Sequence, residues 1–289
     1  KYLLKNIGFE VADTWIGLDD NDKAAWKRIQ LKAKGKTPKI RPAKPFLLQK
    51  EAIKKAKEYF IRKKSTRGKL IMPCGTGKSL TSYWITHELK AKKIIIAVPS
   101  IALVKQTLNV WANETILNKR KIEWLCVCSD ETVGSDQDEI VSSTSDLGIR
   151  PTTNQKEIEK FIKRKTNNHK IIFTTYQSGQ VTAKAARKTK TIFDLGIFDE
   201  AHKTVGHKDK KMAHLLLEKN VKIKKRLFMT ATERIFRMNK DEYLSMDNPR
   251  DYGQVFYQLS FKKAIESRPS IISDYKVITF GVSEDEIKN

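Results

Sequence analysis

The stretch that decides the fold is Met72-Pro73-Cys74-Gly75-Thr76-Gly77-Lys78-Ser79. A short apolar run at residues 70–72 leads into it, and a helix-compatible run at residues 79–89 follows. A glycine-rich loop that ends in Gly-Lys-Ser between a strand and a helix is typical of loops that bind phosphate groups. Met72 stands where the usual pattern has its first glycine, but both glycines nearest the phosphate are present. The loop predicts nucleotide binding, because an unliganded glycine-rich turn rarely has this order of strand, loop and helix.

Each residue at the end of this loop has an expected role in holding a nucleotide. Gly75, Thr76 and Gly77 can turn their backbone N–H groups inward around phosphate oxygens. Lys78 can reach the β and γ phosphates, and Ser79 can place its hydroxyl on Mg²⁺ at the positive end of the following helix. These five residues are the expected ATP-binding residues of the loop, with Mg²⁺ as the cofactor and Lys78 also as a catalytic residue.

Outward from the loop, short apolar runs rich in β-branched residues alternate with longer helix-compatible runs. This rhythm predicts an α/β fold, in which a mostly parallel sheet is flanked by helices. Expected strands lie at residues 70–72, 94–98, 122–128, 170–176, 192–198 and 226–230, and expected helices at 47–60, 79–89, 101–111, 155–165 and 212–218.

Two segments differ in composition from this pattern. Residues 1–40 are expected to form a short N-terminal element and a basic linker, because residues 32–44 are rich in lysine, arginine and proline. Residues 41–289 are expected to form the α/β domain. The polar, locally acidic run at 129–154 is expected to be a surface loop or insertion.

The composition excludes several classes of protein. With 57 Lys and Arg against 33 Asp and Glu, the 289-residue chain has a net charge of +24, which favours a polyanionic partner such as nucleic acid. The longest apolar run, residues 94–98, is far too short for a membrane helix, so no membrane partner is expected. The N-terminus has no secretion signal and no initiator methionine, and the three cysteines have neither disulfide nor zinc spacing. We expect a cytoplasmic, or otherwise intracellular, protein.

A second motif follows the apolar run at residues 192–198. Asp199 and Glu200 come directly after it, at the edge where parallel sheets bind ligands. Asp199 can hold Mg²⁺ through water, and Glu200 can orient the water that attacks the γ-phosphate. Such a pair alone is usually a solvated strand end, but together with a phosphate-binding loop it predicts a nucleoside triphosphatase in which both carboxylates are catalytic.

The order of these motifs resembles that of superfamily 2 helicases and translocases with a DEAH box. The phosphate-binding loop is similar to their motif I, the stretch from Asp199 to His202 to their motif II, and residues 226–232 to their motif III. This resemblance implies a RecA-like P-loop fold. It also implies that His202 belongs to the catalytic set and that Thr230 and Thr232 couple hydrolysis to movement.

Further motifs extend the resemblance to residues 46–232. Gln49 is similar to the glutamine that reads adenine in this family, and residues 95–100 to motif Ia. The Thr-Thr-Tyr-Gln-Ser stretch at 174–178 is similar to a turn that touches the nucleic-acid backbone. The implied DNA contacts are Ser100, Lys105, Thr174, Thr175 and Ser178, although helix caps and a solvated face would also explain these residues.

Within the superfamily, the wording of the motifs resembles the motor domains of type I, type III and single-polypeptide restriction enzymes and related phage or viral helicases. The resemblance implies an ATP hydrolase that moves on double-stranded DNA, with nuclease or methyltransferase domains or subunits as partners. Two alternatives stay open: a nucleic-acid-binding P-loop module with little or no ATPase activity, and a P-loop ATPase that acts on protein.

These motors use two RecA-like domains, and only 57 residues follow Thr232. We therefore expect this chain to hold the first RecA-like domain, with a closing strand at residues 275–280 that leads toward a second one. Alone, such a domain should bind ATP and hydrolyse it poorly.

Overall fold

A computed structural model describes residues 41–129, 150–208, 211–236, 242–268 and 270–272. The chain divides into two compact units, residues 1–42 and 43–289, and the second contains the phosphate-binding loop and the Asp-Glu pair. The expected N-terminal element, most of the expected insertion at 129–154 and the expected strand at 275–280 lie outside the described residues. No described helix is long and apolar enough to cross a membrane.

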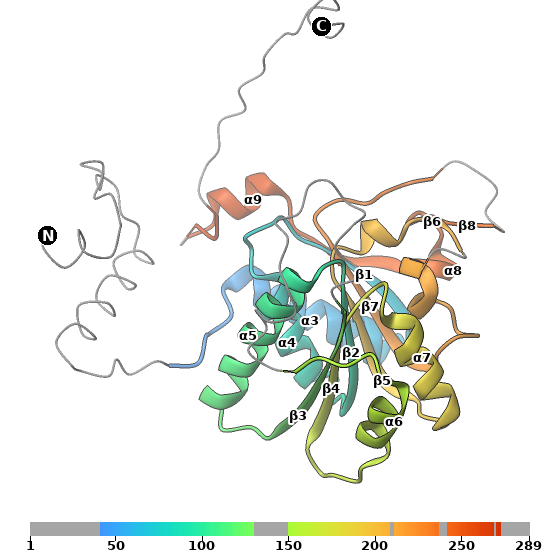
Figure 1. Cartoon of the computed structure of the whole chain (residues 1–289). Helices are drawn as coiled ribbons and strands as arrows, with labels where there is room; N and C mark the ends of the chain where they lie inside the picture. The colour runs from blue at the N-terminus through green and yellow to red at the C-terminus, as the bar shows by residue number, and fades with distance from the viewer. Residues whose placement is uncertain (1–40, 130–149, 209–210, 237–241, 269, 273–289) are drawn as a thin grey trace, which may run out of the picture. The chain divides into compact units, whose positions relative to one another are not determined.

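A seven-stranded sheet forms the centre of the unit, in the order β3-β4-β2-β5-β7-β1-β9 (Figure 1). All of its neighbouring strands are parallel. The α/β fold with a parallel sheet is thus confirmed, and each expected strand overlaps an observed one. The strands are β1 Arg67–Ile71, β2 Lys93–Val98, β3 Ile122–Val127, β4 His169–Thr175, β5 Phe193–Phe198, β7 Ile223–Thr230 and β9 Gln254–Gln258.

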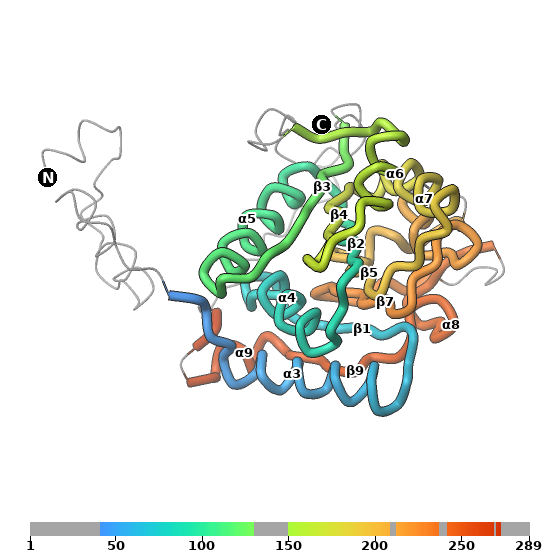
Figure 2. The backbone as a smooth tube through the Cα atoms, turned by 90° about the horizontal axis from the view of Figure 1, so that it is seen from below, coloured from blue at the N-terminus to red at the C-terminus, as the bar shows by residue number. Residues whose placement is uncertain are grey.

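Both faces of the sheet are covered, which explains why its strands read as unbroken apolar runs. Alternate residues of β2 divide between two hydrophobic clusters: Ile94 and Ile96 face one side, and Ile95 and Ala97 the other. The first side packs against α3 (Leu47–Lys57), the π-helical turn η1 (Glu58–Arg62), α4 (Lys78–Glu88), α5 (Ile101–Leu117) and α9 (Phe261–Glu266). The second packs against α6 (Gln155–Lys163), α7 (Gly179–Lys188), the 3-10 helices η4 (Ala201–Thr204) and η5 (Lys211–Leu216), and α8 (Pro249–Tyr252) (Figure 2).

Several boundaries differ from the expectation. The predicted helix at 47–60 ends as α3 at Lys57 and continues as the π-helical turn to Arg62. The predicted helix at 212–218 is instead a 3-10 helix, η5. A two-stranded antiparallel pair, β6 (Gly206–His207) and β8 (Tyr243–Leu244), stands apart from the main sheet.

The edge strand β9 was not predicted, and a glycine allows it to pack beside β1. Gly253 has a φ of +75°, and a Cβ at this position would lie 1.9 Å from the carbonyl oxygen of Arg67. Only glycine fits so close to the neighbouring backbone. Strand β9 therefore forms the edge of the sheet next to β1, the strand that leads into the phosphate-binding loop.

Candidate nucleotide-binding site

The phosphate-binding loop leaves the carboxyl end of β1 and turns into α4. Gly75 and Gly77 have φ values of +79° and +77°, a conformation that favours glycine. The hydroxyl of Thr76, between them, donates to the carbonyl oxygen of Pro73 at 2.7 Å and so closes the loop on itself. This bond helps to fix the conformation of the loop backbone.

Gln49 holds the loop from the start of α3. Its Oε1 accepts from the backbone N–H of Phe46 at 2.9 Å, and its Nε2 donates to the carbonyl oxygen of Thr76 at 3.0 Å. A Cβ at Gly77 would lie 2.6 Å from that Nε2, so a side chain there would collide with Gln49. The structure thus brings Gln49 against the loop, which gives it a positioning role; the adenine contact that the resemblance implies stays a prediction.

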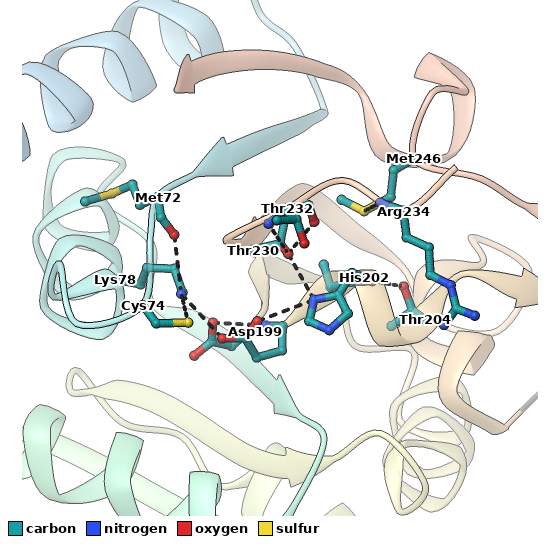
Figure 3. Close-up of polar contacts among 12 residues, drawn as sticks. Met72, Cys74, Lys78, Asp199, His202, Thr204, Thr230, Thr232, Arg234 and Met246 are labelled. Carbon is teal, nitrogen blue, oxygen red and sulfur yellow. Dashed lines mark hydrogen bonds and ion pairs between the residues drawn. The ribbon is translucent and has the colours of Figure 1, made fainter. Parts of the chain in front are cut away.

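Lys78 begins α4, is almost fully buried and lies beside Met72 and Cys74 at one end of the group of residues drawn in Figure 3. Its Nζ lies 3.4 Å from the carbonyl oxygen of Met72 and 3.4 Å from Oε1 of Glu200. Ser79, the next residue, is half-buried at the same helix end. The predicted cation therefore faces the predicted carboxylate across the site.

Asp199 and Glu200 lie at the carboxyl end of β5, as the sequence predicts. Burial, together with the charge of Glu200, raises the pKa of Asp199 to about 6, although Lys78 opposes the rise. Asp199 Oδ1 accepts from the backbone N–H of Glu200 at 3.0 Å, and the Tyr176 hydroxyl donates to the carbonyl oxygen of Asp199 at 2.7 Å. The φ of Glu200, +48°, turns its side chain back toward Lys78. The sequence analysis did not identify Tyr176. This residue lies in the turn after β4, and its hydroxyl bond to Asp199 holds the end of β5 in place.

His202 connects the second motif to the third. Its Nδ1 lies 3.0 Å from Oγ1 of Thr230 and 3.4 Å from Oε2 of Glu200. The Thr230 hydroxyl donates its one hydrogen to the carbonyl oxygen of Thr232, so Nδ1 of His202 must donate to Thr230. Burial lowers the pKa of His202, which keeps the ring neutral at pH 7. A continuous path of polar contacts thus runs from Lys78 through Glu200 and His202 to the end of β7.

The loop after Thr232 is anchored by a buried cation that the sequence analysis did not identify. Lys69, on β1, is 5% exposed, and its Nζ contacts a carboxylate oxygen of Glu233 and the carbonyl oxygen of Met246. The sequence feature that could have indicated a buried lysine is the position of Lys69 directly before the apolar run at residues 70–72. Lys69 ties the strand that carries the phosphate-binding loop to the segment that follows the third motif.

The expected DNA-contacting residues separate into exposed and buried sets. Ser100 caps α5 by accepting from the backbone N–H of Leu103, and Lys105 is exposed one turn later. Since β2 and β4 are neighbours, the turn that ends at Ser178 lies at the same sheet edge. Ser178, which precedes α7, is only 8% exposed and so belongs to the buried set, which corrects its expected role as a DNA contact.

Thr174 and Thr175 are a correction to the expected contact surface, because both are fully buried. The Thr174 hydroxyl donates to the carbonyl oxygen of Val127 at 2.9 Å. Oγ1 of Thr175 accepts from the backbone N–H of Ser178 at 3.3 Å. Their side chains hold the turn in shape and do not present a surface to a ligand.

Comparison with known proteins assigns most of the chain to a family. The model of the family described as "Type III restriction enzyme, res subunit" matches residues 43–235. A probable helicase of African swine fever virus is 31% identical over 232 residues, which are 80% of this chain and 23% of that protein. The chain therefore spans about a quarter of the length of this relative.

Two solved structures are similar in both sequence and fold. A nuclease-deletion mutant of the type ISP restriction-modification enzyme LlaGI, in complex with a DNA substrate mimic, is 33% identical, with a TM-score of 0.60 over 77% of this chain and 20% of that enzyme. The type ISP enzyme LlaBIII, bound to DNA, is 31% identical, with a TM-score of 0.64 over 78% of this chain and 16% of that enzyme. With its matched region covering both motifs of the site, the chain belongs to the ResIII family of restriction-enzyme-type helicase motor domains.

Proposed function

We propose that this chain is the first RecA-like motor domain of an enzyme that hydrolyses ATP to move on double-stranded DNA, within a restriction-modification system or a related phage or viral enzyme. The observation that carries the proposal is the path of contacts from Lys78 through Glu200 and His202 to Thr230. A cation, a general base and a link to another strand are the parts that phosphoryl transfer coupled to movement requires.

The first step is recognition of the triphosphate by the loop. The backbone N–H groups of Gly75, Thr76 and Gly77 surround the phosphate oxygens, and Lys78 Nζ turns from Glu200 to the β and γ phosphates. Because the γ-phosphate carries more negative charge than one carboxylate, it competes well for this lysine. Binding of ATP therefore releases Glu200 to orient the attacking water.

The donor set of the site fits Mg²⁺. The Asp199 carboxylate and the Ser79 hydroxyl are oxygen ligands, and Mg²⁺ sites in nucleotide-binding proteins commonly use one or two such groups together with phosphate oxygens. When bound, the ion neutralises charge on the phosphates. Its double charge also favours ionised Asp199, which burial otherwise disfavours.

A further step transmits the change at Glu200 to the rest of the domain. Glu200 shares His202 with Thr230, so a movement of Glu200 toward a water changes the contact that His202 makes with β7. Thr230 in turn bonds to Thr232, which leads into the segment held by Lys69. The proposed DNA contacts, Ser100 and Lys105, lie at the start of α5, which follows β2, the neighbour of β4.

The proposed partners are double-stranded DNA, a second RecA-like domain, and nuclease or methyltransferase domains or subunits. Both type ISP relatives were solved with DNA or a DNA mimic. A +24 chain suits a polyanionic track that is read through its phosphates.

The test is ATP turnover by the full-length protein, with and without duplex DNA of unrelated sequences. We expect DNA to stimulate turnover and Glu200→Gln to abolish it while ATP binding persists, because an amide keeps the shape but cannot polarise water. Glu157→Gln, an exposed change on α6, is the matched control. Low turnover that DNA does not change, or hydrolysis at the parent rate by Glu200→Gln, would refute the proposal and favour a binding module or a protein-directed ATPase.

A further inference from the structure

A groove between α3 and α4 is separate from the nucleotide-binding site. Its volume is about 460 Å³, within the range of small-molecule sites, and its walls come from α3, the last turns of α4 and the turn after α5. Figure 2 shows the two helices side by side. Lys78 begins α4, whereas His87, which lines the groove, stands nine residues later, about 13 Å along the helix axis. The groove therefore has a ligand-sized space of its own.

Cations dominate the rim of this groove. Lys50, Lys54, Lys57 and Arg120 line it and are exposed, against a single carboxylate, Glu88. Lys57 pairs with that carboxylate at 2.8 Å. Among the described residues, Lys50, Lys54 and Arg120 make no ion pair, so three cations remain available to an anionic ligand.

The interior of the groove is apolar and contains an aromatic ring. Trp84 and Ile53 are half-buried there, both packed against the hydrophobic core of the sheet. His87 beside them has its pKa lowered to about 4, mainly by burial, so its ring is neutral at pH 7. Within the described part of the chain its buried Nε2 has no hydrogen-bond partner. The groove thus offers an apolar interior with an aromatic ring, inside a cationic rim.

We propose that this groove binds a nucleotide unit, with the base against Trp84 and the phosphate on Lys50, Lys54 and Arg120. Aromatic rings inside cationic grooves are how proteins hold single-stranded nucleic acid without sequence preference. An acidic peptide would satisfy the cations but would leave Trp84 and Ile53 uncovered, so the combination favours a base that carries a phosphate. The unit can come from a free nucleotide or from a single strand, and the proposal does not depend on the function of the phosphate-binding loop.

The first experiment locates the ligand on the 289-residue protein. The probes are 5-iodo-deoxyuridine monophosphate and a thymidine octamer with one 5-iodouracil, cross-linked by light and mapped by mass spectrometry. We expect the peptide that contains Trp84 to carry the cross-link. Labelling by the mononucleotide identifies a nucleotide site, and labelling by the octamer alone identifies a strand site. Cross-links confined to other peptides would overturn the proposal.

The second experiment measures octamer affinity in variants. Trp84→Leu should weaken binding about fivefold or more, while Trp84→Phe, which keeps an aromatic face and guards against misfolding, should retain most of it. Lys50→Ala with Lys54→Ala should make the dependence of log affinity on log salt shallower by about 1.4, at about 0.7 per phosphate of a single strand. Lys156→Ala with Lys160→Ala is the matched control, an exposed pair at the same spacing on α6.

Three outcomes would refute the proposal. The first is octamer affinity that Trp84→Leu leaves unchanged, which would reduce the groove to a general cationic surface. The second is an equal change of salt dependence in the two lysine pairs. The third is binding of polyglutamate with the same dependence on Trp84 as the octamer, which would assign the groove to acidic protein segments.

Discussion

Removing the charge of Asp199 should stabilise the nucleotide-free domain, and the gain should depend on pH. Burial raises the pKa of this carboxyl from 3.8 to about 6, so the folded protein binds the proton more tightly than the unfolded chain does. Because each tenfold change in proton affinity is worth about 1.4 kcal/mol, ionised Asp199 costs the fold about 3 kcal/mol above pH 6. Below pH 3.8 the carboxyl is protonated in both states and the cost disappears.

The substitution Asp199→Asn keeps the shape of the side chain and its acceptor for the Glu200 N–H. Its amide nitrogen has the cation Lys78 nearby, and a buried donor without an acceptor costs about 1–2 kcal/mol at every pH. We therefore expect the variant to be about 1–2 kcal/mol more stable than the parent at pH 8. Near pH 4.5 the variant should have lost most or all of this advantage.

The assay is urea denaturation from pH 4.5 to 8, in a chelating buffer without nucleotide. Asp194→Asn is a control of opposite sign: although burial raises the pKa of Asp194, bonds from Lys224 and the backbone of Lys92 and Lys93 lower it overall. That variant should lose about the same stability at pH 8 and at pH 4.5, because the Asp194 carboxyl is ionised in both the folded and the unfolded state over this range. A stability difference between Asp199→Asn and the parent that does not change with pH would refute the reasoning.

Three further substitutions test the loop, the anchor and the sheet edge. Lys78→Met should remove most ATP affinity, measured by calorimetry, since it takes away the cation that meets the β and γ phosphates; unchanged affinity would contradict the site. Lys69→Met should lower the free energy of unfolding by about 1–3 kcal/mol in urea, because it breaks the buried contacts with Glu233 and Met246. Gly253→Ala should cost more than about 2 kcal/mol, because its Cβ would overlap a β1 carbonyl; parent-like melting would show that β9 yields easily.

The elements that the sequence predicted are those whose local pattern agrees with their place in the fold. Strands β2 and β5 are buried on both faces, and their sequences are nearly unbroken apolar runs. Strand β9 was missed because it lies at the sheet edge, where only Tyr257 of its five residues is buried. Helix α7 was missed because it begins with Gly179 and is rich in alanine and lysine, so its apolar face is narrow.

The candidate site shows the same division. The loop glycines, Lys78 and the Asp199–Glu200 pair could be found from the sequence, because their spacing within the two motifs predicts their chemistry. The burial of Thr174 and Thr175 could not be predicted, since it depends on Val127 and on the turn that Ser178 closes. The burial of Lys69 could not be predicted either. A buried cation needs acceptors, and those of Lys69, on Glu233 and Met246, are far from it in the sequence.

The ion pair between Lys78 and Glu200 joins the phosphate-binding loop to the end of β5. Glu200 is held by Lys78 on one side and by His202 on the other, so under the proposed function a bound phosphate that draws the lysine away would free its carboxylate. A base that is free to polarise water only after the triphosphate has bound would couple recognition to hydrolysis. It would also mean that the His202–Thr230 contact first changes when ATP enters, so that the signal to β7 begins with binding and precedes bond cleavage.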